Sequence, residues 1–182
     1  LIGFFDDYLK IVNRNSVGLC PWQKMLGQIL VTGMFAWYLS YTGNIPQAMR
    51  IPFIEGRYLR LGALEIPFLF LVVTGTANGT NFTDGLDGLV SSVTVMVATF
   101  FTVVSMGMGA GIEPLTCAVA GALLGFLLFN VHPASVFMGD TGSLALGGFV
   151  AGCAYMMQMP LFLPIVGLIY VAEVLSVIIQ VV

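Results

Sequence analysis

The sequence predicts an all-α integral membrane protein, a polytopic helical bundle, and three observations support this fold class. Of the 182 residues, 58% are hydrophobic and only 8% are charged, whereas charged residues make up about 25% of an ordinary soluble domain. The mean hydropathy is +0.99. The apolar residues gather in segments that approach the ~20 residues of a membrane-spanning helix and are too long for the strands of a barrel. This composition excludes an ordinary soluble domain.

Six apolar segments can be drawn, and we expect each to be a transmembrane helix. They cover residues 25–41, 63–77, 89–106, 115–129, 144–157 and 161–182. The second, fourth and fifth are shorter than a straight span, so they must borrow flanking residues. Glycines recur in Gly121-x-x-x-Gly125 and in Gly147-Gly148-x-x-x-Gly152, a spacing that lets helix backbones approach closely. We expect residues 1–182 to form one transmembrane domain.

The polar connections divide between two faces if each segment crosses the bilayer once. Residues 1–24, 78–88 and 130–143 then share one face, and 42–62 lies on the other. All five aspartates fall on the first face. Lysine and arginine are split three against three, so the positive-inside rule does not decide which face is cytoplasmic. Within 42–62, Glu55-Gly56 separates two runs rich in strand formers, which favours a small hairpin.

The first group of charged residues is Asp6-Asp7-x-x-Lys10. On a helix, Lys10 lies four residues from Asp6 and three from Asp7, so all three side chains can share a face. One interpretation is a surface ion pair at a helix end. The other is a pair of carboxylates for Mg²⁺ or for proton transfer, with Lys10 holding a phosphate.

The second group places an oxygen-bearing side chain at every third position, interleaved with glycines that let backbone amides approach a ligand. Its members are Asn78, Asn81, Asp84 and Asp87, with Gly79, Gly85 and Gly88 between or beside them. A glycine-rich turn that caps the helix beginning near Leu86 is the structural alternative. Capping explains one such residue but not four in register.

The third group lies in 130–143, with Asn130, His132, Phe137, Gly139 and Asp140. Asp140 could cap the helix that follows or bind a metal ion directly. A helix N-terminus also favours anions, so the two interpretations overlap. For His132 a loop or capping role is favoured over catalysis, although its pKa would suit proton transfer. Taken alone, Phe137 is expected to pack at the membrane interface.

Together these strings resemble the phospho-N-acetylmuramoyl-pentapeptide-transferase family, within the superfamily of polyprenyl-phosphate N-acetylhexosamine-1-phosphate transferases. The resemblance runs from DDYLK at 6–10 through NFTDGLDGL at 81–89 and FNVHPASVFMGDTGSLALGG at 129–148 to EVLSVIIQV at 173–181. Lys10 after the aspartate pair and Thr83 before Asp84 favour this branch of the superfamily.

The resemblance implies a Mg²⁺-dependent transfer of phospho-MurNAc-pentapeptide from UDP-MurNAc-pentapeptide to undecaprenyl phosphate, giving lipid I and UMP. This is the first membrane step of peptidoglycan synthesis. Members of the family have about ten transmembrane helices, commonly form homodimers, and act at the cytoplasmic face of the bacterial inner membrane. Residues 1–24, 78–88 and 130–143 would then be cytoplasmic, and 42–62 periplasmic or extracellular. The resemblance also suggests a target of nucleoside antibiotics.

Site roles are carried over from this resemblance residue by residue. Asp140 resembles the direct Mg²⁺ ligand, and Asp6 and Asp7 resemble an acidic pair assigned to the metal or to deprotonating the lipid phosphate. By the same resemblance the predicted catalytic residues are Asp6, Asp7, Asp140, Lys10, Asp84 and Asp87. The predicted substrate-binding residues, which resemble those that line the nucleotide and phosphate site or flank its uracil, are Asn81, Gly85, Leu86, Asn130, Phe137 and Gly139.

Two departures and two rival functions accompany this interpretation. The family's earlier helices and its histidine-rich cytoplasmic motif are absent, so we expect a fragment truncated at both ends, without turnover on its own. A one-step attack and a covalent aspartyl-phosphate both remain open. The nearest rival is a sister transferase that moves GlcNAc-1-phosphate from UDP-GlcNAc, and a more distant one is a cation channel selected by aspartate rings. The chain has no basic patch for nucleic acid.

Overall fold

The computed structural model describes residues 1–14, 18–42, 48–54 and 56–181, and it is almost entirely helical. Its helices are α1 (Ile2–Val12), α2 (Pro21–Thr42), α3 (Glu65–Thr83), α4 (Leu89–Met108), α5 (Glu113–Asn130), α6 (Gly139–Met156), α7 (Leu163–Val166) and α8 (Leu168–Val181). Short 3₁₀ turns, η1 (Gly62–Leu64) and η2 (Pro160–Phe162), precede α3 and α7. The prediction of an all-α polytopic membrane protein is confirmed.

Each of the six predicted segments falls on helix, but they differ as membrane spans. Within the described ranges, three helices are long and apolar enough to cross a bilayer: Gly62–Thr83, Leu89–Met108 and Glu113–Asn130. The pair Pro160–Val166 and Leu168–Gln180 makes a fourth if it counts as one span, although it is bent by 76°. The continuous helix expected over 161–182 is therefore wrong, because Gly167 ends α7 and α8 begins in a new direction.

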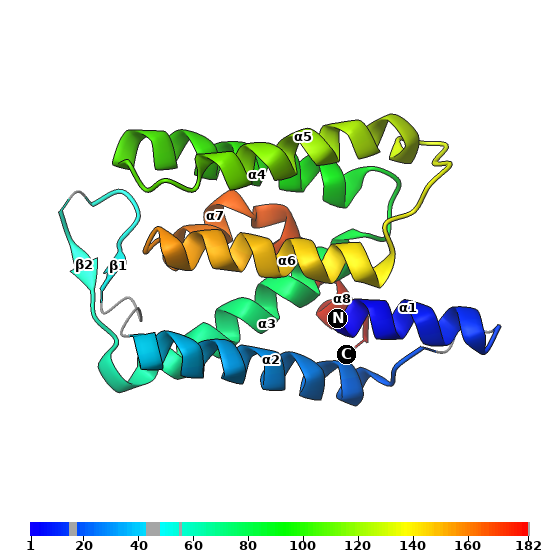
Figure 1. Ribbon diagram of the computed structural model, residues 1–182, viewed down its shortest axis with the longest axis horizontal. Coiled ribbons are helices and arrows are strands. Elements are labelled where there is room, and N and C mark those ends of the chain that lie inside the picture. Colours follow the sequence, from blue (N-terminus) through cyan, green and yellow to red (C-terminus); the bar gives the residue numbers. More distant parts are fainter. Residues whose placement is uncertain (15–17, 43–47, 55, 182) are drawn as a thin grey trace.

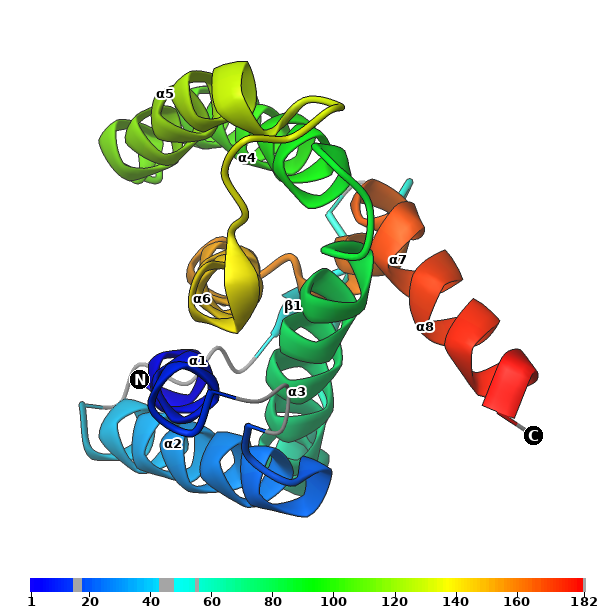
Figure 2. The same ribbon diagram turned by 90° about the vertical axis from the view of Figure 1, so that its right-hand side faces the viewer.

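The helices are arranged around α6 and α3. The pair α4 and α5 packs on one side, α6 lies between this pair and α1, and α2 closes the opposite side against α3 (Figures 1 and 2). Figure 2 shows α8 leaving the bundle beside α3, so that its far end projects away from the other helices. A cluster of buried side chains that includes Val97, Phe101, Val150 and Met157 joins α4 to α6.

Close contact between α3 and α6 depends on one glycine. A Cβ added at Gly147 would lie 2.5 Å from the Cα of Ala77, a separation that forces neighbouring atoms to shift. Beside it, the Thr80 hydroxyl donates to the backbone oxygen of Ser143 at 2.8 Å. This contact fixes the end of α3 beside the start of α6.

The other glycines of the predicted packing motifs make no such contact. Among the described residues, no atom lies within 4 Å of a Cβ built at Gly121, Gly125, Gly148 or Gly152. The expectation that these four bring backbones together within this chain is therefore wrong. Spacing alone does not tell which side of a helix meets a neighbour.

The segment 42–62 carries a two-stranded antiparallel ladder, β1 (Met49–Arg50) with β2 (Tyr58–Leu59). Met49 pairs with Leu59 and Arg50 with Tyr58. Residues 43–47 and 55, which belong to the predicted hairpin segment, lie outside the described residues. The ladder lies near the C-terminal end of α6, whereas α1 packs at its N-terminal end (Figure 1).

Candidate active site

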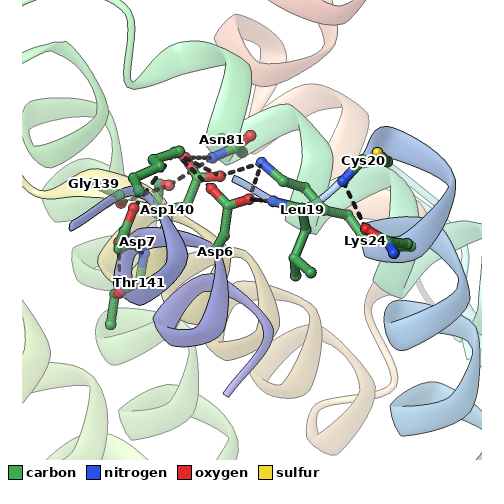
Figure 3. A network of polar contacts seen from close by, with 12 residues as sticks. Asp6, Asp7, Leu19, Cys20, Lys24, Asn81, Gly139, Asp140 and Thr141 are labelled. Carbon is green, nitrogen blue, oxygen red and sulfur yellow. Dashed lines mark hydrogen bonds and ion pairs between the residues drawn. The ribbon is translucent and has the colours of Figure 1, made fainter. Parts of the chain in front are cut away.

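Three aspartates from distant parts of the sequence converge where α1 meets the start of α6. Asp6 and Asp7 lie on α1, and Asp140 lies in the first turn of α6. One ligand oxygen from each of these carboxylates lies within 4.8 Å of the others. Figure 3 shows the three side chains with their polar partners. Helix α1 can come this close because Gly3 lies against the backbone of Asp140, where a Cβ would collide.

Asp6 is fully buried and accepts from several donors. The Lys10 ammonium lies 2.5 Å from its Oδ2, and the Lys24 ammonium lies 3.1 Å from its Oδ1. The backbone N–H of Leu19 also donates to Oδ1, at 2.6 Å. Burial by itself would raise the pKa of Asp6, but these hydrogen bonds, led by the one from Lys10, bring it well below the usual range. Asp6 is therefore a carboxylate.

Asp7 is held by the residue that follows Asp140. The backbone N–H and the hydroxyl of Thr141 both donate to Asp7 Oδ2, at 2.8 and 2.6 Å. Burial opposes ionisation, but these bonds and the charge of Lys10 lower the pKa of Asp7. Gly139 has φ +67°, and a Cβ there would lie 2.9 Å from Asp7 Oδ2. Glycine at 139 is thus required by the backbone and by its contact with Asp7.

Both carboxylate oxygens of Asp140 accept hydrogen bonds. Its Oδ1 accepts from the Asn81 amide at 3.1 Å, and its Oδ2 accepts from the Lys24 ammonium at 2.5 Å. The same Asn81 nitrogen donates to the Ser143 hydroxyl at 2.9 Å. Asn81 therefore connects the end of α3 to the first turn of α6, where a negative charge is also favoured by the helix dipole.

Lys24 was not among the predicted site residues. It lies in the first turn of α2 and contacts both Asp6 and Asp140. The sequence offered one signal for it, a lone lysine at the start of an otherwise apolar helix. Such a lysine is usually an interface anchor, so the pattern gave no reason to place it beside the carboxylates.

The four residues spaced three apart separate in space. Asn81 reaches the carboxylate cluster, whereas Asn78 exchanges hydrogen bonds with Gln28 and joins α3 to α2. Asp84 follows α3, where burial, and then the charges of Asp140 and Asp7, raise its pKa to about 6. Asp87 instead contacts His132 and Ala134. The register predicted from the sequence therefore does not form one row of ligands.

Asp87 and Asn130 join two loops of the predicted aspartate face. Asp87 Oδ2 accepts from the Ala134 backbone N–H at 3.1 Å and lies 3.0 Å from the His132 ring. The Ala134 bond, followed by His132, lowers the pKa of Asp87. Asn130 accepts from the Gly88 N–H at 3.1 Å and donates to the Val136 carbonyl at 2.9 Å.

Of the remaining predicted residues, three lie on the same loops and are exposed to solvent. Leu86 is 68% exposed and Phe137 is 73% exposed. Gly85 is also exposed. These positions can meet a ligand that enters from outside the bundle.

The donor set of the cluster suits a hard divalent cation beside phosphate groups. Mg²⁺ prefers carboxylate oxygens and is usually held by one or two of them together with substrate phosphates. Three carboxylates meet here, and the ammonium groups of Lys10 and Lys24 already lie among them as cations. The same lysines could neutralise phosphate oxygens. The residues present therefore fit both a metal ion and an anionic substrate.

Comparison with known proteins gives a family and close relatives. The family described as "Glycosyl transferase family 4" matches residues 1–158. A protein of Clostridium perfringens named phospho-N-acetylmuramoyl-pentapeptide-transferase is 49% identical over 182 residues, which is 99% of this chain and 56% of the relative. Proteins of the same name are 51% identical in Clostridium botulinum and 50% identical in Acetivibrio thermocellus, each over 100% of this chain and 55% of the relative. The chain thus spans about half the length of these relatives.

Proposed function

The chain belongs to glycosyl transferase family 4, and from that premise we propose that it is the catalytic part of a phospho-N-acetylmuramoyl-pentapeptide-transferase. The enzyme would transfer phospho-MurNAc-pentapeptide from its UDP carrier to undecaprenyl phosphate and release UMP, with lipid I as the other product. The observation that carries the proposal is the convergence of Asp6, Asp7 and Asp140 beside two lysines. The relatives of that name, which are 49% and 51% identical over 99% and 100% of this chain, support it.

Phosphoryl transfer needs alignment and neutralisation of charge more than covalent help from the protein. When bound, Mg²⁺ would supply positive charge to the phosphates, and Asp140 would hold it together with the carboxylates of α1. Lys10 and Lys24 would neutralise the two anionic substrates. Asp6 or Asp7 would accept the proton of the lipid phosphate.

The loops around Asp87 would form the nucleotide end of the site. Asp87 and Asn130 are held by the loop 130–136, and the exposed side chains of Leu86 and Phe137 would flank the uracil ring. Asp84, Gly85 and Gly139 would line the path between this end and the carboxylate cluster.

The protein would lie in the bacterial inner membrane with the carboxylates facing the cytoplasm, where a UDP-linked substrate is found. Residues 1–24, 78–88 and 130–143 would then be cytoplasmic, and the ladder in 42–62 would be on the outer side. The opposite placement of α1 and the ladder along α6 supports this arrangement (Figure 1). By the same resemblance we propose a homodimer that binds nucleoside antibiotics.

The decisive experiment measures UMP release by the purified protein that contains this chain. With UDP-MurNAc-pentapeptide, undecaprenyl phosphate and Mg²⁺, UMP should appear, and chelation or Asp140→Asn should abolish it. Release from UDP-GlcNAc instead would replace the proposal with the sister reaction. A phosphorylated enzyme trapped when the lipid is omitted would exclude the one-step attack in favour of a covalent intermediate.

A further inference from the structure

The Lys24 ammonium occupies a place between two carboxylates that come from different helices. It lies 2.5 Å from Asp140 Oδ2 and 3.1 Å from Asp6 Oδ1, and its side chain is only 25% exposed. Figure 3 shows the lysine reaching from α2 into the cluster. A cation of this kind on a buried carboxylate compensates for the loss of water around the negative charge.

The oxygens that Lys24 contacts belong to the carboxylates that could share a metal ion. On Asp140, Oδ1 accepts from the Asn81 amide and Oδ2 accepts from the Lys24 ammonium. Each oxygen has a second lone pair, so a neutral amide can stay when a metal binds, whereas the positive charge of Lys24 opposes a dication on the same oxygen. The Asn81 amide is fixed between Asp140 and Ser143, whereas a lysine has a flexible four-carbon stem.

We propose that Lys24 holds the place of the divalent cation and that the cation enters by displacing its ammonium from Asp140. The inference rests on the proposed function for the identity of the site as a metal site. An ammonium and a dication on the same oxygens repel each other, so the two states exclude one another. The displaced ammonium stays within reach of the cluster and becomes available to an anionic substrate, so that metal binding prepares a phosphate-binding cation.

Lys10 provides an internal comparison. Its ammonium lies 2.5 Å from Asp6 Oδ2 but 3.7 Å from Asp140 Oδ2, and it lies one turn away on the same helix as Asp6. Removing Lys10 takes away the same unit of charge without freeing the short contact on Asp140. The two lysines therefore separate competition for the Asp140 oxygen from the loss of one positive charge beside Asp6.

The first test is a titration with Mn²⁺ in place of Mg²⁺. The concentration of free Mn²⁺ is measured from its electron paramagnetic resonance signal, which gives the affinity of the protein for the ion. The protein that contains this chain would be used in neutral lipid nanodiscs, without substrate. Lys24→Met should bind Mn²⁺ about tenfold more tightly than the wild type. Lys10→Met frees an oxygen of Asp6 but no short contact on Asp140, so it should change the affinity roughly threefold or less. Lys24→Arg, which keeps the cation, should not gain affinity. Equal gains in both methionine variants, or no gain in Lys24→Met, would overturn the proposal.

The second test uses the wild type, so it does not depend on whether a variant folds. Reductive methylation followed by mass spectrometry measures how accessible each lysine amine is. Addition of Mg²⁺ should raise the methylation rate of Lys24 severalfold and that of Lys10 less. An unchanged rate at Lys24, under conditions in which Mn²⁺ binds, would refute the displacement. A wild type that binds no Mn²⁺ would instead contradict the metal role in the proposed function.

Discussion

At the scale of single residues, the site separates its carboxyl groups by environment. Asp6 and Asp7 accept strong hydrogen bonds that lower their pKa, whereas burial and neighbouring charges raise the pKa of Asp84 to about 6. Carboxyl groups with pKa values pushed apart are typical of sites that divide binding and proton transfer between them. Asp84 is thus ionised at neutral pH at a cost in stability, which a bound cation would relieve.

The first prediction concerns the pH dependence of that cost. Because the pKa of Asp84 is about 6 in the folded protein and its ordinary value is 3.8, the folded state binds its proton more tightly. Stability therefore falls as the pH rises from about 4 to above 6. Asp84→Asn should raise the free energy of unfolding by about 1–2 kcal/mol at pH 7.5, after allowance for partial exposure. The gain should vanish near pH 4.

Thermal unfolding of detergent-solubilised protein in a chelating buffer measures this effect at both pH values. Asp87→Asn is the control with the opposite sign, because the Ala134 N–H and His132 lower the pKa of Asp87. Its carboxylate stabilises the fold above the unfolded pKa, and this contribution is lost as the pH falls through the lower folded pKa. Asp87→Asn should therefore lower the melting temperature at pH 7.5. A gain for Asp84→Asn that is the same at both pH values would contradict the assignment.

The second prediction concerns how Thr141 positions Asp7. Thr141→Val removes the hydroxyl donor at 2.6 Å but keeps the backbone N–H, so Asp7 becomes less firmly oriented and its pKa rises. A hydrogen bond to a charged group contributes roughly 1.5–3 kcal/mol. We expect kcat for UMP release to fall at least ~10-fold with little change in KM, while Thr141→Ser, which restores the hydroxyl, recovers most of the rate. An equally impaired serine variant would show that the methyl group matters instead.

At the scale of elements, α6 determines the position of the site. Helix α1 reaches it across Gly3, and α3 reaches it across Gly147. The sequence predicted close packing at glycines but could not select among them, because Gly147 and Gly148 have the same local pattern. Only the rotation of α6 about its axis turns Gly147 toward α3, and that rotation is set by the whole bundle.

The third prediction compares these neighbouring glycines. Gly147→Ala would place a methyl group 2.5 Å from the Ala77 Cα, and overpacking of this kind costs about 1–3 kcal/mol. The variant should melt at a lower temperature and lose activity, because α3 carries Asn81 to Asp140. Gly148→Ala is the matched control, since no described atom lies within 4 Å of its added Cβ. Equal melting temperatures for the two variants would contradict the close contact between α3 and α6 at Gly147.

At the scale of the whole molecule, the sequence predicted the helical class and the shared location of Asp6, Asp7 and Asp140. Chain parity was enough for that, because an even number of apolar segments, 25–41, 63–77, 89–106 and 115–129, separates Asp7 from Asp140. Three features escaped prediction because they depend on packing between distant segments. These are the 76° break after α7, the insertion of Lys24 into the cluster, and the separation of Asp87 from the other aspartates by its contact with the loop 130–136.

The last prediction tests whether the carboxylates and the β-ladder lie on opposite sides of the membrane. Cys20 is exposed one residue before α2 and next to Leu19, which donates to the carboxylate cluster. Phe53 is 89% exposed between the strands of the ladder. In a background where Cys117 and Cys153 are replaced by alanine, a membrane-impermeant maleimide should label Cys20 only in inverted vesicles, because the reagent needs a thiolate in water. Phe53→Cys, with Cys20→Ala, should be labelled only in right-side-out vesicles. Labelling of both positions from one side would contradict the opposite placement and the cytoplasmic assignment together, whereas an exchanged pattern would keep the two faces and reverse the orientation.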